Sequence, residues 1–330
     1  MNISELIRFR NSLQENLDMF RMHEPINATC NLLEILVSQH AEVEGYIGYK
    51  IIDFQNKFKT MIPQAQQIMI DFENYIGELN HMIDSEAERK YDETFKTSWR
   101  ESFINGNDQN FYVTKAVDYR VRASIQQYVD WHYPALQLGC RYNGQLPTSA
   151  DYEQGDFVEF TDSITGFEPL YICDFNAESI AKCVSRYNPT YQNKICKYVI
   201  NENDFSRLPQ EQFGFVFCWN MFNYSTLSVL TEYLQSIFSL LRTGGTLMFS
   251  YNNCDLPSSA LCVDLWSGSY IPKRHLIPIC EQLGFEIIDS YDFPNEVGNF
   301  EFSQISWIEI KKPGMLSSAK AHPPLGEIVD

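Results

Sequence analysis

Residues 213–253 read FGFVFCWNMFNYSTLSVLTEYLQSIFSLLRTGGTLMFSYNN, and this stretch decides the fold class. The continuous apolar run from Phe215 to Cys218 predicts a strand that is covered on both faces. Large apolar residues then recur at helical spacing from Leu227 to Leu241. Gly244 and Gly245 are expected to end that helix, because a left-handed C-cap favours glycine. Residues 246–251 are again strand-like, so the stretch predicts one βαβ crossover of a parallel sheet.

The flanking sequence continues this alternation in both directions. Further strands are expected at Pro134–Gly139, Pro169–Asp174, Lys197–Asn201, Phe285–Ser290 and Gln304–Lys311, with helices at Lys115–Trp131, Ala177–Tyr187 and Pro272–Leu283. Alternation over about 200 residues predicts an α/β fold, namely a doubly wound, mostly parallel seven-stranded sheet. Ligands of such sheets bind outside the carboxyl ends of the strands.

Charge and composition exclude several classes of function. The chain has 330 residues and a formal net charge of −18, which disfavours general binding to nucleic acid or to an anionic membrane. There is no run of eighteen apolar residues, and the polar start MNISELIRFRNS does not resemble a secretory signal. The nine cysteines are scattered and form no CxxC pair, so we expect reduced thiols, a cytoplasmic setting and no metal site.

The first third of the chain is strongly helical. Apolar residues alternate in steps of four and three from Ile47 to Met82, and Pro63 is expected to kink or split the helix. Such a seam favours either a coiled coil or bundle that joins subunits, or a cap that packs on the chain's own C-terminal domain. The expected domains are therefore a helical domain at 1–110, an α/β domain at 111–312 and a disordered tail at 313–330.

Three pieces of the α/β domain together resemble a known family. They are LQLGC followed by PLYICDFNAESI, then LLRTGGTLMFSYNN, then PKRHLIPICEQLGFEII. Their order and spacing over residues 115–312 resemble the Rossmann-like (class I) S-adenosylmethionine-dependent methyltransferases. The resemblance implies S-adenosylmethionine as cofactor and methyl transfer to an acceptor that the sequence does not identify: a small molecule, a sugar or a protein.

The resemblance also implies a set of cofactor-binding positions. Gly139 would let the backbone approach the methionine part of the cofactor, and Asp174 would accept the ribose hydroxyl protons. After the third strand, an acid would meet the adenine amino group and an aromatic ring would pack on the purine. The cofactor-binding candidates are Gln137, Gly139, Arg141, Asp174, Asn203, Asp204, Phe205, Cys218 and Trp219, and the acceptor-facing candidates are Asn220, Tyr224 and Tyr251.

The sequence departs from the family pattern after the first strand. Arg141 and Asn143 stand where the family has glycines, and Gln137 replaces an acid. An arginine there is either a bidentate donor to the cofactor carboxylate or a bulky residue that closes the pocket. The segment between Gly139 and Asp174 is also longer than the roughly 20 residues usual in dinucleotide-binding folds.

These departures leave a second class of function open. The chain could be a degenerate methyltransferase-like module with a structural or assembly role through its N-terminal helices. A nicotinamide oxidoreductase fits less well, because the GxGxxG motif is absent. Two lone histidines, His132 and His275, are candidate bases.

Overall fold

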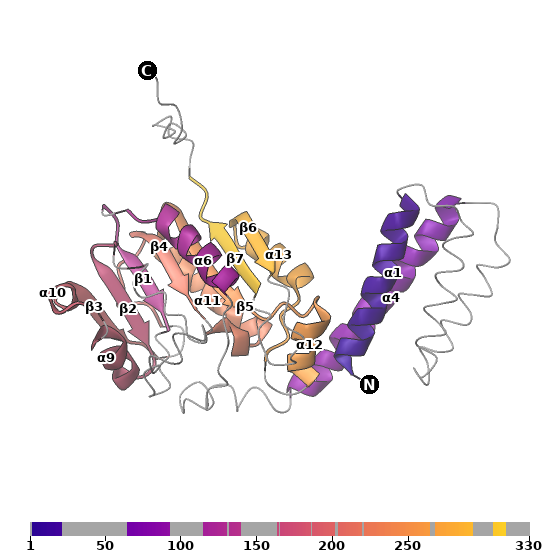
Figure 1. Cartoon of the computed structure of the whole chain (residues 1–330), viewed down its shortest axis with the longest axis horizontal. Helices are drawn as coiled ribbons and strands as arrows, with labels where there is room; N and C mark the ends of the chain where they lie inside the picture. The colour runs from indigo at the N-terminus through magenta and orange to yellow at the C-terminus, as the bar shows by residue number, and fades with distance from the viewer. Residues whose placement is uncertain are drawn as a thin grey trace, which may run out of the picture.

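The structure is a computed structural model that describes residues 2–21, 65–92, 115–130, 132–139, 164, 166–185, 187–201, 204–219, 221–264, 268–292 and 306–314. The first part of the expected helical seam, from Ile47 through Pro63, lies outside these residues. So do the expected domain boundary at residue 110 and the tail from residue 315 onward. Figure 1 shows an α/β body with two long helices, α1 and α4, beside it.

The body is built on a seven-stranded sheet in the order β3-β2-β1-β4-β5-β7-β6. The strands are β1 (Ala135–Leu138), β2 (Leu170–Asp174), β3 (Ile195–Val199), β4 (Phe213–Cys218), β5 (Leu241–Tyr251), β6 (Glu286–Asp292) and β7 (Ser306–Lys311). The expected number and order along the chain are confirmed. Phe215 and Ala135 lie opposite each other, which places β4 directly beside β1.

The sheet is mixed, which corrects the expectation of a mostly parallel one. β1 to β5 pair in parallel, whereas β7 pairs antiparallel with both β5 and β6. The apolar pattern of residues 304–311 predicts where the last strand lies but not in which direction it runs. The direction follows from the position of β7, which lies beside β6, its predecessor along the described chain. Consecutive strands that are neighbours pair antiparallel without a crossover over the sheet face.

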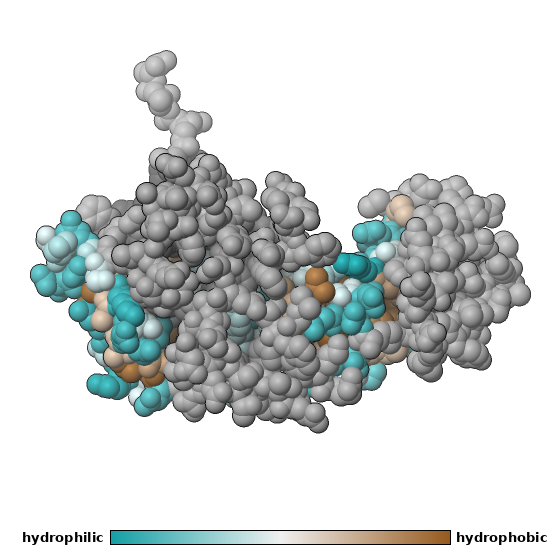
Figure 2. Space-filling view, turned by 60° about the horizontal axis from the view of Figure 1, so that its bottom comes forward, coloured by the Kyte–Doolittle hydropathy of each residue, from teal (hydrophilic) through white to brown (hydrophobic). Residues whose placement is uncertain are grey.

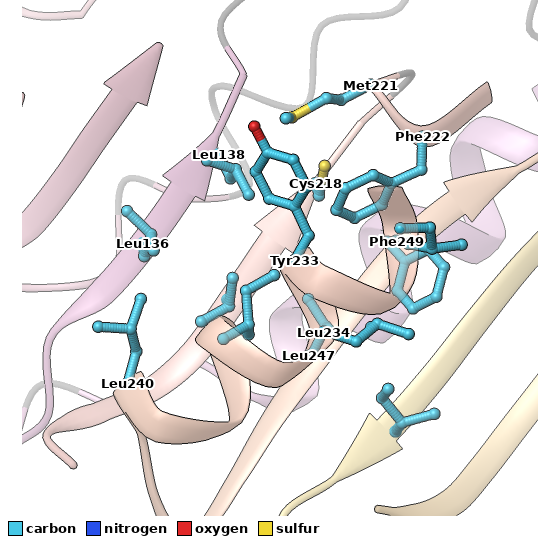
Figure 3. Packing of buried hydrophobic residues seen from close by; sticks show 14 of the residues in the cluster. Leu136, Leu138, Cys218, Met221, Phe222, Tyr233, Leu234, Leu240, Leu247 and Phe249 are labelled. Carbon is cyan, nitrogen blue, oxygen red and sulfur yellow. The ribbon is translucent and has the colours of Figure 1, made fainter. Parts of the chain in front are cut away.

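Helices cover both faces of the sheet. One core cluster joins the strands to α11 (Leu227–Leu240) and α13 (Lys273–Gln282). The other joins them to α6 (Lys115–Gln127) and α9 (Ala177–Ser185). Figure 3 shows the first cluster, in which Leu234 of α11 packs near Leu247 of β5. Burial on both faces explains why β4 is almost continuously apolar.

Gly244 and Gly245, which were expected to end the helix, lie within β5 instead. The helix ends at Leu240, and residues 241–251 already belong to β5. Gly244 has a φ of 79° inside this strand, where the register between β4 and β5 shifts. A Cβ on Gly245 would lie 2.6 Å from the carbonyl oxygen of Phe213. The glycines therefore permit a close approach of two strands, and they do not cap the helix.

The described N-terminal helices pack on each other and on the body. These helices are α1 (Ile3–Arg21) and α4 (Ala65–Asp92), and they share an apolar cluster with α12 (Pro257–Asp264). The ring centroids of Phe9 and Tyr75 lie 6.4 Å apart, edge to face. Asp264 also accepts hydrogen bonds from the backbone N–H groups of Ile3 and Ser4, both at 2.9 Å, and so caps α1.

The described part of the seam is thus occupied within the chain. Phe72, Tyr75 and Leu79 are buried in the cluster with α1 and α12. A cap on the chain's own α/β body would make this contact within the chain. A separate helical domain and a coiled coil between subunits stay predictions. Figure 2 shows hydrophilic residues predominating on the described surface of that view, with hydrophobic ones in small areas only.

Candidate functional site

The sheet order places a switch point between β1 and β4. From β1 the chain adds β2 and β3 on one side, and then β4 and β5 on the other. In doubly wound sheets, ligands bind in the crevice where the order reverses, outside the carboxyl ends of the strands. Gly139 follows β1, Asp174 ends β2 and Trp219 follows β4, so these positions meet at one edge.

Gly139 has the backbone conformation that glycine favours. Its φ is 78°, and its N–H donates to the carbonyl oxygen of Cys173 at 2.8 Å. This bond ties the end of β1 to the end of β2. A Cβ at Gly139 would lie 3.5 Å from the Cβ of Met221, which is an ordinary contact distance. Arg141 and Asn143, which follow, lie outside the described residues.

Asp174 is a buried carboxylate at the end of β2, with 4% of its surface exposed. Its Oδ1 accepts the backbone N–H of Asn176 at 2.9 Å, just before α9 begins. A carboxylate is an acceptor only, and it suits a ligand that presents hydroxyl donors. The chemistry of Asp174 therefore fits the ribose of a nucleoside cofactor.

Gln137 faces α9. Its Oε1 accepts from the hydroxyl of Tyr187 at 3.2 Å, and its Nε2 lies 3.5 Å from the carbonyl oxygen of Gly139. Nε2 also lies 3.8 Å from the Sγ of Cys183. The amide that replaces the family's acid is thus bonded within the protein, where it links the end of β1 to the helix beyond β2.

Of the cofactor-binding candidates after β3, one lies at the surface and one lies in the core. Asp204 is exposed, and its Oδ1 accepts the N–H of Ser206 at 3.0 Å. Hydrogen bonds from Ser206 lower the pKa of this carboxyl. Phe205 is buried, with its ring edge to face against Tyr233 at 5.8 Å. Asn203 lies outside the described residues.

The residues after β4 are packed as well. Burial raises the pKa of the Cys218 thiol well above its usual value, so it stays protonated at neutral pH. Trp219 stacks on Trp307 of β7, with ring centroids 5.1 Å apart and planes 15° apart. Asn220 lies outside the described residues. Figure 3 shows Met221 and Cys218 at the strand ends, with the Tyr233 ring pointing toward them from α11.

Two tyrosines were expected to face a methyl acceptor. Tyr224 belongs to the short 3-10 helix η1 (Phe222–Tyr224) and is buried. Tyr251 ends β5 and is also buried, and burial raises the pKa of its hydroxyl. Both lie at the carboxyl edge of the sheet, inside the protein.

A network of asparagines, which the sequence analysis did not single out, joins the loops after β4 and β5. Ser250 Oγ donates to Asn223 Oδ1 at 2.9 Å, and Asn252 Nδ2 donates to the carbonyl oxygen of Ser269 at 2.9 Å. Asn253 Nδ2 donates to Asp292 Oδ1 at 3.0 Å. The available signal was Asn223 after β4 and Asn252 and Asn253 after β5, but the partners of these residues are distant in the sequence.

The two candidate bases have different surroundings. His132 is exposed, and its Nδ1 lies 2.9 Å from Asp130 Oδ1. His275 on α13 lies with Nε2 2.9 Å from Oδ2 of Asp84 on α4. Tyr270 and Arg274 contact the same carboxylate. The second histidine therefore belongs to a polar cluster between the N-terminal helices and the body.

A pocket of about 720 Å³ opens beside this cluster, between α4, α11 and α13. Nothing in the sequence pattern indicated it, because it is formed by helices far apart in the chain. Its lining residues are His81, Asp84, Ala87, Glu88, Thr226, Leu227, Ser228, Thr231, Tyr270, His275 and Ile279.

Comparison with solved structures finds similar folds among methyltransferases. The N-methyltransferase NodS from Bradyrhizobium japonicum WM9, in complex with S-adenosyl-L-homocysteine, is 11% identical over 67% of this chain and 98% of its own, with a TM-score of 0.45. Geranyl diphosphate C-methyltransferase from Streptomyces coelicolor A3(2) is 11% identical over 67% of this chain and 98% of its own, with a TM-score of 0.44. The chain resembles class I methyltransferases. The resemblance is one of fold.

Neither comparison based on sequence finds a relative. No protein-family model matches the chain, and no curated protein matches it. In the part of the chain that the structure describes, no helix has the length and apolar character needed to cross a membrane.

Proposed function

We propose that the chain is a methyltransferase that uses S-adenosylmethionine. One observation carries the proposal: Gly139 with its φ of 78° and the buried carboxylate of Asp174 lie side by side at the switch point of the sheet. A backbone that a ligand can approach closely and an acceptor for hydroxyl groups are the two features that nucleoside cofactors require at this edge.

The residues at this edge fit the cofactor in part. Asp174 would hold the ribose, and Gly139 would lie against the methionine part. Bound there, the cofactor supplies a methyl group on a sulfonium. Phe205, Trp219 and Cys218 already pack within the protein, so their role would be to shape the site and to exclude water from it. Arg141 and Asn203 keep their proposed cofactor roles as predictions.

The proposed reaction does not require a dedicated acid or base side chain. Methyl transfer depends mainly on holding donor and acceptor in line, which lowers the entropic part of the barrier. The buried polar groups after β4 and β5 would hold the loops that present the acceptor. Asn220, Tyr224 and Tyr251 are proposed to face it. The acceptor class is proposed to be a small molecule, a sugar or a protein, in a cytoplasmic setting.

A second candidate is a methyltransferase-like module with an assembly role. It is favoured by the contacts that Phe205 and Trp219 make inside the protein. Under this proposal the N-terminal helices join subunits. Removing residues 1–95 would then lower the mass measured in solution by more than the mass of the deleted segment.

Calorimetric titration with S-adenosylmethionine and S-adenosylhomocysteine separates the two candidates. We expect binding by the full chain, and at least tenfold weaker binding by Asp174→Ala. Asp130→Ala is the matched control, because Asp130 lies before β1 at the other end of the strand. Circular dichroism verifies that each variant is folded. Absence of binding by the unmodified chain would refute the methyltransferase, and unchanged binding by Asp174→Ala would refute the site.

A further inference from the structure

The pocket between α4, α11 and α13 has the size of a small-molecule site. Its volume of about 720 Å³ lies within the range of roughly 300–1,000 Å³ that is common for such sites. It is also a composite pocket, because α4 comes from the N-terminal helices and the other walls come from the α/β body.

One wall of the pocket is a single face of α4. His81, Asp84 and Glu88 follow one another at steps of three and four, so they point to the same side of the helix. The opposite wall is the start of α11, which presents hydroxyl groups. Thr226 Oγ1 accepts the N–H of Val229 at 3.3 Å and caps this helix.

The hydroxyl groups alternate with apolar surface. Thr231 Oγ1 donates to the carbonyl oxygen of Leu227 at 2.8 Å and retains acceptor capacity, and Ser228 is exposed. The side chains of Leu227 and Ile279 and the ring of Tyr270 add apolar area to the lining. The lining therefore suits a ligand that carries hydrogen-bonding groups on an apolar frame.

The charges beside the pocket are largely compensated. Asp84 accepts from Arg274, from the Tyr270 hydroxyl at 2.6 Å and from His275 Nε2 at 2.9 Å. Arg274 also pairs with Asp255, which in turn meets Arg10 at 2.9 Å. Two carboxylates thus face two guanidinium groups.

The remaining charge at the pocket is small. Among the described lining residues, Glu88 is the other acid, and His81 and His275 contribute imidazoles. A pocket built for a strongly charged ligand would present an uncompensated cluster of opposite sign. The described residues of this lining do not, and they offer four hydroxyl groups and two imidazoles that can both donate and accept.

We propose that this pocket binds a neutral, polyhydroxylated small molecule with an apolar face, such as a glycoside. Its hydroxyl groups would bond to Ser228, Thr231 and Glu88, and its apolar face would lie on Leu227 and Tyr270. Gly139 and Asp174 are not among the described residues that line this pocket, so the proposal does not depend on methyl transfer and goes beyond the function proposed above.

Three small probes with the same aromatic body test the ligand class. They are phenyl β-D-glucopyranoside, which is neutral, 2-phenylethylamine, which is a cation, and phenylacetate, which is an anion. Saturation-transfer NMR with the full chain measures their dissociation constants. We expect the glucoside to bind at least fivefold more tightly than either charged probe. Tighter binding of a charged probe, or no binding of any probe, overturns the proposal.

A pair of tryptophan variants locates the binding. Ser228→Trp places a large side chain at the pocket and should weaken glucoside binding at least tenfold. Ser239→Trp makes the same change at an exposed position of α11 outside the pocket and should leave binding unchanged. Equal affinities of the two variants would show that the glucoside binds elsewhere. Cofactor titration of the same variants is independent of this result, so the two proposals fail separately.

Discussion

Gly139 and Asp174 lie close together because the backbone pairs the ends of β1 and β2. The hydrogen bond from Gly139 N–H to the carbonyl of Cys173 fixes the end of β1 against the end of β2. Asp174 is then held by the N–H of Asn176. Each residue has a local reason for its conformation, but only the parallel pairing of β1 with β2 makes them neighbours.

Replacing Gly139 with alanine should lower the free energy of unfolding by about 1–2 kcal/mol, because its φ of 78° disfavours residues with a Cβ. Steric overlap adds little, since that Cβ would lie 3.5 Å from Met221. Gly139→Asn should lower the free energy of unfolding by less, because asparagine adopts positive φ values more readily than alanine does. Urea unfolding measures both, and equal losses would contradict the conformational explanation.

Glu309 supplies a second test at this scale. It is 1% exposed on β7, and Oε2 accepts the Tyr128 hydroxyl at 2.6 Å. Tyr128→Phe removes a donor from a buried acceptor and should lower the free energy of unfolding by about 1–3 kcal/mol. Tyr133→Phe, the same change at an exposed tyrosine, should have an effect within about 0.5 kcal/mol. Thermal or urea unfolding measures both variants. Similar losses of stability in the two would show that the Tyr128–Glu309 hydrogen bond does not stabilise the fold.

Among the elements, the junction of α11 with β5 shows how neighbouring segments of the sheet constrain a turn. Arg242 lies over the ring of Tyr133 at 3.7 Å, and Gly244 N–H donates to the carbonyl of Lys312 at 2.8 Å. Gly245 faces the backbone of Phe213. The turn is therefore shaped by β4 and by residues just before β1 and just after β7, and not by the helix that precedes it.

Gly245→Ala should lower the free energy of unfolding by about 2–4 kcal/mol, since its Cβ would lie 2.6 Å from a backbone oxygen. Gly77→Ala is the matched change, because a Cβ at Gly77 on α4 meets nothing within 4 Å. It should raise stability by about 0.5–1 kcal/mol, as alanine is the better helix former. Chemical unfolding of both variants measures the difference, and a neutral Gly245→Ala would contradict the close approach.

For the whole molecule, ion pairs join the N-terminal helices to the body. Arg274 on α13 contacts Asp84 of α4 and Asp255, which follows β5, and Asp255 contacts Arg10 of α1. Burial raises the pKa of Asp255, but the charges of Arg274 and Arg10 outweigh it and lower the pKa below its usual value. The pKa of Asp84 is also below its usual value. Burial raises this pKa, but hydrogen bonds from His275 and Tyr270 and the charge of Arg274 together lower it by more.

Acid should therefore weaken this junction. Because both carboxyl groups have depressed pKa values in the folded chain, their stabilisation is complete above about pH 4 and is lost as the pH falls through the folded values. The double variant Asp84→Asn, Asp255→Asn should show a shallower loss of stability below pH 4. Glu281→Gln, on the exposed side of α13, is the control. Parallel stability–pH curves for all three proteins would contradict this assignment.

Removing the Arg274 guanidinium, which lies between the two carboxylates, should lower the free energy of unfolding at pH 7 by more than removing an exposed cation does. Arg274→Met leaves two partly buried carboxylates without that partner and should lower the free energy of unfolding by about 3 kcal/mol. Lys182→Met breaks an exposed pair with Glu178 and should change it by less than about 0.5 kcal/mol. Urea unfolding at pH 7 compares them, and equal effects would show that the junction adds no stability.

The sequence predicts the α/β class, the seven strands with their approximate limits, and the positions of Gly139 and Asp174 at strand ends. These features follow from local periodicity and from glycine and acid at fixed offsets, which a single stretch of chain contains. The direction of β7, the role of Gly244 and Gly245, and the packing of Trp219 were decided by the tertiary structure alone. Each depends on a partner far away in the chain, as do the pocket beside α4 and the charges that join α1 and α4 to the body.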